Sequence, residues 1–248
     1  MIPRGILLDI EGTTSSVSFV YDVMFPFVRR ELQSYLRAHW GEPALSAAVD
    51  QIARDAGHGD FHTMLRSQSP GGRAMVHPPT VLHREVERLM DGDVKATGLK
   101  QLQGLIWEAG FASGELKAHV YDDVPPALRD WHARGIDLRI YSSGSIQAQK
   151  LFFGHTIAGN LLPLLSGHYD TTTGPKKEAA SYHTIAADFG LAPSEILFLS
   201  DVVAELDAAR TAGMQTALVI RPGNAAAADG HAEIKSFSDL ECGDSSPL

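Results

Sequence analysis

The sequence predicts an α/β fold with a mostly parallel, doubly wound sheet and a helical insertion after the first strand. Short apolar runs, typical of strands buried on both faces, recur along the chain, and in its second half they alternate with helix-like segments. From Ser15 to about Leu116, amphipathic helical patterns instead follow one another without a good strand between them. That interval is therefore expected to be an insertion into the α/β core.

Each expected strand is a short apolar run that ends in polar residues. The runs are GILLDIEGTT, ending at Asp9; DLRIYSSGS, ending at Ser142 and Ser143; EILFLSD, ending at Asp201; and TALVIRPG, which ends at Gly223 and has no obvious chemical residue. A fifth strand is expected between Leu164 and Asp170. Ligands of open parallel sheets bind at the carboxyl ends of the strands, so the residues there are the candidates for chemistry.

Helices are expected between the strands and throughout the insertion. Ser145 is a suitable N-cap, and Gly190 and Gly213 follow the ends of two further helical patterns. Two stretches read as loops, SQSPGGRAMVHPP (67–79) and AAAADG (225–230). The expected helices span 145–153, 177–189 and 203–212 in the core and 27–40, 45–56, 81–91 and 99–107 in the insertion.

Composition and charge exclude several classes of protein. The 248 residues contain no apolar run near the ~20 needed to span a bilayer, and the N-terminus lacks a secretory signal, so we expect a soluble, cytoplasmic protein. A net charge of −9 without a basic cluster argues against nucleic acid as a partner. The single cysteine, Cys242, excludes an intrachain disulfide and lies beside a tail (243–248) that reads as frayed. The 11 scattered histidines lack zinc-site spacing, and His155 is expected to be structural.

The carboxylates at the strand ends predict a magnesium site. Residues at i and i+2 of an extended chain point the same way, so Asp9 and Glu11 can share a site, and Gly12 allows a sharp turn. Asp201 would add a third carboxylate, with Glu205 supporting from the following helix. Packed acids repel one another unless a cation neutralises them, and oxygen ligands without His or Cys suit Mg²⁺.

Hydroxyls and a lysine predict a phosphate site beside these acids. Ser142 and Ser143 precede a glycine and a helix start, where backbone N–H groups bind anions. Lys176 lies in a polar loop before another helix, and its neighbour Lys177 competes with it by proximity alone. Taken singly, an Asp at a strand end is more often a turn or cap residue and a loop lysine is usually solvated. The joint pattern across three strand ends favours a site.

These motifs resemble those of the haloacid dehalogenase superfamily. The matching elements are Asp-x-Glu-Gly-Thr, Ser-Ser-Gly-Ser, the loop lysine, and Ser-Asp after an apolar strand. The resemblance implies a Rossmann-like catalytic core, here 1–14 and 117–248, with a helical cap domain at 15–116 that closes over the site. It also implies Mg²⁺ and an aspartyl-phosphate intermediate.

A closer resemblance, from the first strand to about Asp239, is to the acireductone synthase family, the bifunctional enolase-phosphatases of methionine salvage. It is carried by KQLQG (100–104), YSSGSIQAQKLFFGH (141–155) and VIRPGNA (219–225). The family implies that a monomer enolises 5-(methylthio)-2,3-dioxopentyl phosphate and then removes its phosphate, leaving 1,2-dihydroxy-5-(methylthio)pent-1-en-3-one. Carried over, one Mg²⁺ per subunit is bound by Asp9, Glu11 and Asp201, Asp9 and Glu11 are catalytic, and Ser142, Ser143 and Lys176 bind the substrate phosphate. The cap residues expected near the substrate are Lys100, Gln101, Gln103 and Trp107, although Trp107 also fits a helical core.

Other functions remain open from the sequence. A haloacid dehalogenase-type phosphatase for another small phosphate ester has the same core motifs. A dehalogenase would have no purpose for Glu11 and the phosphate-binding hydroxyls. A signalling receiver also clusters acids, a hydroxyl and a lysine, but it is about half this length. An inactive scaffold would be expected to have lost a catalytic acid or the lysine, and none is missing.

Overall fold

The computed structural model describes residues 3–68, 77–224 and 230–240, and the chain divides into two compact units. Unit 1 comprises Met1–Tyr21 and Lys117–Leu248, and unit 2 comprises Asp22–Leu116, so the division falls later in the chain than Ser15. Cys242, the tail after it and most of the two expected loops at 67–79 and 225–230 lie outside the described residues.

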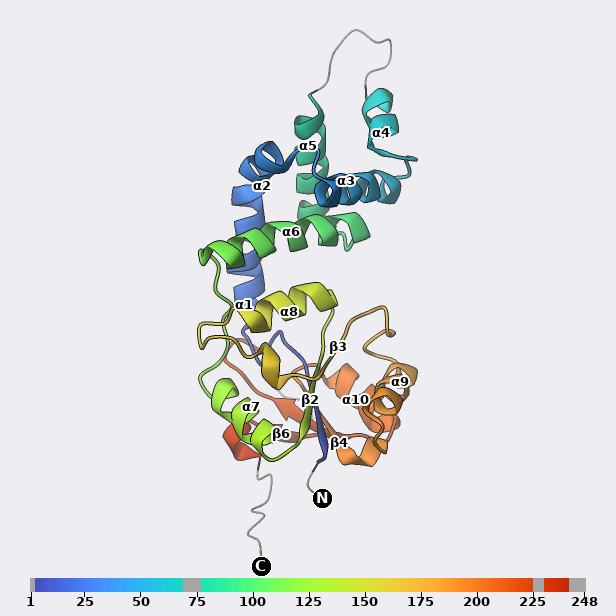
Figure 1. The fold of residues 1–248 in the computed structure, drawn as a ribbon. Coiled ribbons are helices and arrows are strands. Elements are labelled where there is room, and N and C mark those ends of the chain that lie inside the picture. Colours follow the sequence, from blue (N-terminus) through green and yellow to red (C-terminus); the bar gives the residue numbers. More distant parts are fainter. Residues whose placement is uncertain (1–2, 69–76, 225–229, 241–248) are drawn as a thin grey trace, which may run out of the picture. The chain divides into compact units, whose positions relative to one another are not determined.

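The described residues of unit 1 form a six-stranded parallel sheet in the order β3-β2-β1-β4-β5-β6 (Figure 1). This arrangement confirms the α/β fold class. The strands are β1 (Gly5–Leu8), β2 (Asp137–Tyr141), β3 (Gly167–Tyr169), β4 (Ile196–Ser200), β5 (Gln215–Val219) and β6 (Ala232–Ile234). β6 was not expected, because its three residues are too few to form a recognisable apolar run.

The strands are apolar because helices cover both faces of the sheet. β1 and β4 are buried along their whole length. On one face, Leu7 and Phe198 pack with residues of α9 (Ala179–Phe189) and α10 (Val203–Thr211). Side chains alternate along a strand, so Ile6 and Leu8, both fully buried, point to the opposite face. Complete burial on both sides therefore explains the continuous apolar runs.

The helices of unit 1 include three of the expected segments. They are α8 (Ile146–Gly154), α9 and α10, and a further helix, α7 (Val124–Ala133), packs against β2. Ser145 caps α8 as expected, because its Oγ accepts a hydrogen bond from the backbone N–H of Ala148 at 3.2 Å. α7 was missed because it begins with Val-Pro-Pro, which reads as a turn.

Strand register brings the candidate residues to one edge of the sheet. Leu8 is paired with Ile140 on one side and with Leu199 on the other. Asp9 therefore lies level with Ser200, and its N–H donates to the carbonyl of Leu199 at 3.0 Å. The chain moves to opposite sides of β1 to form β2 and β4, which makes this the switch point where ligands bind in such sheets.

Unit 2 is helical in its described part. Its helices are α2 (Phe25–His39), α3 (Pro43–Asp55), α4 (Phe61–Ser67), α5 (Pro78–Asp91) and α6 (Thr97–Ser113), and a short α1 (Val17–Phe19) and a π-helical turn (Val20–Met24) precede them. α6 packs on α2 and α3. Trp107 of α6 is buried, and its Nε1 donates to the carbonyl of Met24 at 3.0 Å, which is the core role considered for it. Among the described residues, no helix has the length and apolar character needed to cross a membrane.

Candidate active site

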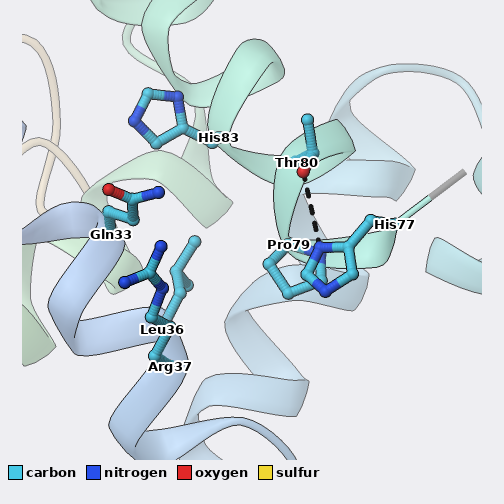
Figure 2. Close-up of a pocket in the computed structure, with 7 residues that line it drawn as sticks. All are labelled: Gln33, Leu36, Arg37, His77, Pro79, Thr80 and His83. Carbon is cyan, nitrogen blue, oxygen red and sulfur yellow. Dashed lines mark hydrogen bonds between the residues drawn. The ribbon is translucent and has the colours of Figure 1, made fainter.

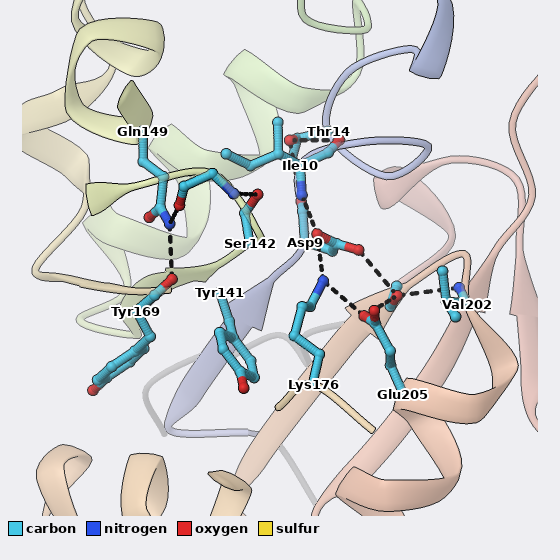
Figure 3. A network of polar contacts seen from close by, with 12 residues as sticks. Asp9, Ile10, Thr14, Tyr141, Ser142, Gln149, Tyr169, Lys176, Val202 and Glu205 are labelled. Carbon is cyan, nitrogen blue, oxygen red and sulfur yellow. Dashed lines mark hydrogen bonds and ion pairs between the residues drawn. The ribbon is translucent and has the colours of Figure 1, made fainter. Parts of the chain in front are cut away.

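Three strand ends of unit 1 carry the acids and hydroxyls identified in the sequence. Asp9 directly follows β1, Ser142 follows β2 and Asp201 follows β4. Asp9 and Ser142 are almost completely buried, at 5% and 2% exposure. Figure 3 shows both residues in the network of polar contacts at the ends of their strands. Ser143 and Glu11 are partly exposed.

Lys176 joins Asp9 in a buried ion pair. Its Nζ lies 2.8 Å from Asp9 Oδ1 and 2.7 Å from an oxygen of Glu205, and only 10% of its side chain is exposed. Burial by itself would lower the pKa of Lys176, but the two carboxylates raise it above its ordinary value. Lys176 therefore carries its charge at neutral pH, while the neighbouring Lys177 is exposed.

The loop that carries Lys176 is held by hydroxyl groups. Tyr182 donates to the carbonyl of Lys176 at 2.6 Å, Ser181 to that of the preceding proline at 2.8 Å, and Tyr141 to that of Gly174 at 2.8 Å. Gly174 has φ +153°, and a Cβ there would overlap Ser181 Oγ. These contacts fix which of the two adjacent lysines points inward.

Ser200 and Glu205 complete the network around Lys176. The Ser200 hydroxyl lies 3.2 Å from Asp9 Oδ2 and 3.3 Å from Glu205 Oε2, so one donor serves two carboxylates. Burial and the charge of Asp9 raise the pKa of Glu205 to about 7, although Lys176 opposes the shift. Glu205, expected only to support the site from the next helix, is in fact the second ion-pair partner of Lys176. Sequence reasoning quoted Ser200 only as part of the Ser-Asp motif and gave it no role of its own.

Asp201 lies beside the two acids that follow β1. Burial first, and then the negative charge of Asp9 with a smaller contribution from Glu11, raise the pKa of Asp201 to about 6. Gly12 has φ +71°, and a Cβ there would overlap the carboxylate of Asp201. The turn after Glu11 therefore passes directly against Asp201, and only glycine allows this approach.

The loop after β2 is held in shape by backbone and amide contacts. The N–H of Gly144 donates to Ser142 Oγ at 3.2 Å, and the N–H of Ser142 donates to the carbonyl of Tyr169 at 3.2 Å. Gln149 Nε2 donates to the carbonyls of Gly144 and Tyr169 at 2.9 and 2.8 Å. The loop leads into the N-terminus of α8, an arrangement suited to anions.

A separate cavity of about 350 Å³ lies within unit 2. Figure 2 shows its lining residues, which include none of the predicted site residues. They are Gln33, Leu36, Arg37, His77, Pro79, Thr80 and His83.

Comparison with known proteins identifies the family. The model of the haloacid dehalogenase-like hydrolases matches residues 3–213. The chain is 49% identical to Enolase-phosphatase E1 of Pseudomonas aeruginosa (strain UCBPP-PA14) over 97% of this chain and 99% of that protein. The Drosophila melanogaster protein of the same name is 44% identical over 92% of this chain and 87% of its own length. The chain belongs to the enolase-phosphatase family of haloacid dehalogenase-like hydrolases. It is therefore an enzyme.

Solved structures share the fold of this chain. The UTR4 protein of Saccharomyces cerevisiae superposes with a TM-score of 0.78 at 34% identity, and the match covers 96% of this chain and all of that one. A phosphatase of the haloacid dehalogenase type from Thermococcus onnurineus, at 17% identity and a TM-score of 0.57, shares the fold. That match covers 96% of this chain and 95% of the other.

The donor chemistry of this enolase-phosphatase fits a hard divalent cation. Asp9, Glu11 and Asp201 offer oxygen donors only. Burial, and then repulsion from Asp9 and Glu11, raises the pKa of Asp201, and a shared cation would oppose the repulsion. Within the described residues, however, no three His, Cys, Asp or Glu side chains are grouped closely enough to hold a metal as they stand. The three-carboxylate magnesium site stays a prediction.

Proposed function

We propose that this enolase-phosphatase converts 5-(methylthio)-2,3-dioxopentyl phosphate into 1,2-dihydroxy-5-(methylthio)pent-1-en-3-one and phosphate, a step of L-methionine salvage. The observation that carries the proposal is the buried Lys176–Asp9 ion pair beside Asp201, in a chain 49% identical to an enolase-phosphatase. An inward-facing lysine, a carboxylate at the switch point and a hydroxyl loop beside it can bind and cleave a phosphate ester.

Enolisation comes first in this scheme. Glu11 removes a proton from the carbon that bears the phosphate ester, and the electron pair of that C–H bond forms the enolate double bond as the adjacent carbonyl oxygen gains negative charge. Glu11 is partly exposed, so it can reach a bound ligand, and its side chain is one methylene longer than an aspartate. Its placement against Asp201 through the Gly12 turn keeps it at the site.

Phosphate removal then uses Asp9. A carboxylate oxygen of Asp9 attacks phosphorus while the P–O bond to the enol oxygen breaks, and Glu11 returns a proton to that oxygen. A water molecule, deprotonated by Glu11, next attacks phosphorus as the P–O bond to Asp9 breaks, which releases Asp9 and inorganic phosphate. The remaining enolate oxygen takes up a proton from solvent, and Glu11 gives its proton back to solvent. Lys176 offsets the negative charge of the phosphoryl oxygens, and Ser142 and Ser143 hold them.

Mg²⁺ is the metal we propose for this site, held by Asp9, Glu11 and Asp201, one ion per subunit. When bound it would neutralise the clustered carboxylates and polarise substrate oxygens. Further proposals from the sequence are a cap role for residues 15–116, substrate contacts by Lys100, Gln101 and Gln103, a monomeric state and a cytoplasmic location.

The reaction can be followed directly. Purified enzyme with the diketo phosphate and Mg²⁺ should release phosphate while an ultraviolet absorbance change reports the enediol. Phosphate release without a transient enol would instead favour a phosphatase for another small ester. Absence of phosphate release from this substrate would refute the proposed function.

A further inference from the structure

We propose that Asn224 and Arg221 are positioning residues that clamp the turn after β1, and thereby hold Glu11 and Gly12 against Asp201. The inference rests on the function proposed above for Glu11. Both residues belong to the segment after β5, in which sequence analysis found no chemical residue. The clamp assigns a role to this segment.

Three successive carbonyls of the turn each accept a hydrogen bond from a distant part of unit 1. Asn224 Nδ2 donates to the carbonyl of Gly12 at 2.9 Å, and Arg221 Nε donates to that of Thr13 at 3.0 Å. The backbone N–H of Tyr121 donates to that of Thr14 at 3.1 Å. Because residues 12 to 14 are fixed at each peptide, Glu11 immediately before them has little freedom to move.

Asn224 is itself anchored to the sheet. The same Nδ2 donates to the carbonyl of Val219, the last residue of β5, at 3.2 Å. An amide nitrogen has two donor hydrogens, so both are used on backbone carbonyls. The side chain therefore ties the turn after β1 to the end of β5.

Arg221 is buried, with 6% exposure, and its side chain makes more contacts than that of Asn224. Its Nη1 lies 3.0 Å from the carboxylate of Asp123 and donates to the carbonyl of Lys235 at 3.2 Å. Its guanidinium lies over the rings of Tyr121 and Phe237, with Cζ 4.4 and 5.0 Å from their centroids. Asp123 also accepts a hydrogen bond from the backbone N–H of Phe237 at 2.7 Å. These contacts connect one buried cluster, which consists of Arg221, Asp123, Tyr121, Phe237 and Thr13.

This buried polar cluster contributes less to stability than apolar packing would. Four buried side-chain atoms in the described residues have no hydrogen-bond partner, and three belong to this cluster: Thr13 Oγ1, Tyr121 Oη and Arg221 Nη2. Apolar residues of similar volume would often be neutral or more stable than a buried ion pair. The cluster therefore does not maximise the stability of the fold. Its location beside the turn that carries Glu11 is better explained if it serves to position that turn.

The clamp predicts a split between catalysis and phosphate binding. Loosening the turn displaces Glu11, and a 1 Å misplacement of a catalytic group can cost ~100-fold in rate. Asn224→Ala should therefore lower the rate of solvent-deuterium exchange and kcat by ~10- to 100-fold. The inhibition constant of inorganic phosphate should stay near that of the wild type, because Ser142 and Lys176 lie on other loops. Asn224→Asp should lower kcat further than Asn224→Ala does, because it places a carboxylate oxygen against the two backbone carbonyls.

The matched control is Asn160→Ala. Asn160 is exposed and its side chain accepts the N–H of Leu162 at 3.0 Å, so the substitution removes one amide–backbone bond away from the turn. Asn160→Ala should leave kcat unchanged. In a Glu11→Gln background, Asn224→Ala should add little further loss of deuterium exchange, because both substitutions disable the same group.

Two results would overturn the clamp. One is a folded Asn224→Ala variant with the wild-type melting temperature and unchanged kcat. The other is a double variant in which the losses of deuterium exchange from Asn224→Ala and Glu11→Gln are additive. Additive losses would show that Asn224 does not act through Glu11. Turnover of the diketo phosphate by the wild type tests the proposed function separately. If the wild type does not turn over the diketo phosphate, kcat of Asn224→Ala and of the wild type is measured with p-nitrophenyl phosphate instead. Equal kcat values with that substrate would also overturn the clamp.

Discussion

Replacing Lys176 by Met should remove the only cation of the buried network in the described residues, while Lys177→Met should leave it intact. Lys176 Nζ lies 2.8 and 2.7 Å from two carboxylates, so each pair is worth about 6 kcal/mol of gross Coulomb attraction at an effective dielectric of 20. Desolvation of the ammonium offsets much of this. Removing one partner of a buried pair typically costs ~3–5 kcal/mol, which is the expected loss when both acids stay ionised.

The loss should depend on pH. Without Lys176 the folded-state pKa of Glu205 rises further above its unfolded value, so the variant loses stability as pH increases. Glu205, whose pKa is already about 7, takes up a proton more readily below that pH and limits the penalty. Urea unfolding should therefore show a larger deficit at pH 8 than at pH 6.

The catalytic effect should exceed the effect on stability. Losing a preorganised charge that faces the phosphoryl group should lower kcat for phosphate release by at least ~100-fold. Lys177→Met, an exposed substitution, should change stability by less than ~0.5 kcal/mol and leave kcat near the wild-type value. Equal kcat values for the two variants, or a greater loss at Lys177, would refute the assignment of Lys176.

Three further substitutions test the acids and the turn. Asp201 has a folded-state pKa raised from 3.8 to about 6, so its ionisation lowers stability increasingly as pH rises from about 4 to above 6. Asp201→Asn in chelator should stabilise by ~1–2 kcal/mol at pH 7.5 and by much less at pH 4.5 in urea unfolding, and a loss of stability at pH 7.5 would contradict this. Glu11→Gln should slow exchange of the carbon-bound hydrogen with solvent deuterium by at least ~100-fold, measured by NMR; exchange at the wild-type rate would exclude Glu11 as the base. Gly12→Ala should abolish activity and should lower the melting temperature more than Gly114→Ala does. Gly114 has a similar φ (+76° against +71° for Gly12), but a Cβ there would have no neighbour within 4 Å. Equal shifts in melting temperature would refute the close approach of Gly12 to Asp201.

Local patterns predicted the strand ends well. Asp9, Ser142 and Asp201 each follow an apolar run, and a run buried on both faces leaves few alternatives to a central parallel strand. Four helices of the insertion, α2, α3, α5 and α6, were also predictable, because their apolar spacing repeats every turn, whereas the seven-residue α4 was missed. α7 and β6 were missed, one for its proline-rich start and the other for its three-residue length.

The contacts between side chains were less predictable. Sequence could not choose between Lys176 and Lys177, because the choice depends on three hydroxyl contacts from Tyr182, Ser181 and Tyr141. Glu205 was named only as a supporting residue, since its approach to Lys176 depends on how α10 leaves β4. Arg221 lies in a segment that reads as a turn, and nothing local shows that a charge there is buried.

The stereochemical course at phosphorus tests directly whether Asp9 is the nucleophile. The measurement uses the phosphorothioate analogue of the diketo phosphate, made chiral at phosphorus with two oxygen isotopes and hydrolysed in water that carries the third, and analyses the configuration of the released inorganic thiophosphate. Attack by Asp9 followed by attack of water gives two in-line displacements, and retention of configuration is expected. Inversion would show a single displacement by water and would contradict an aspartyl-phosphate on Asp9.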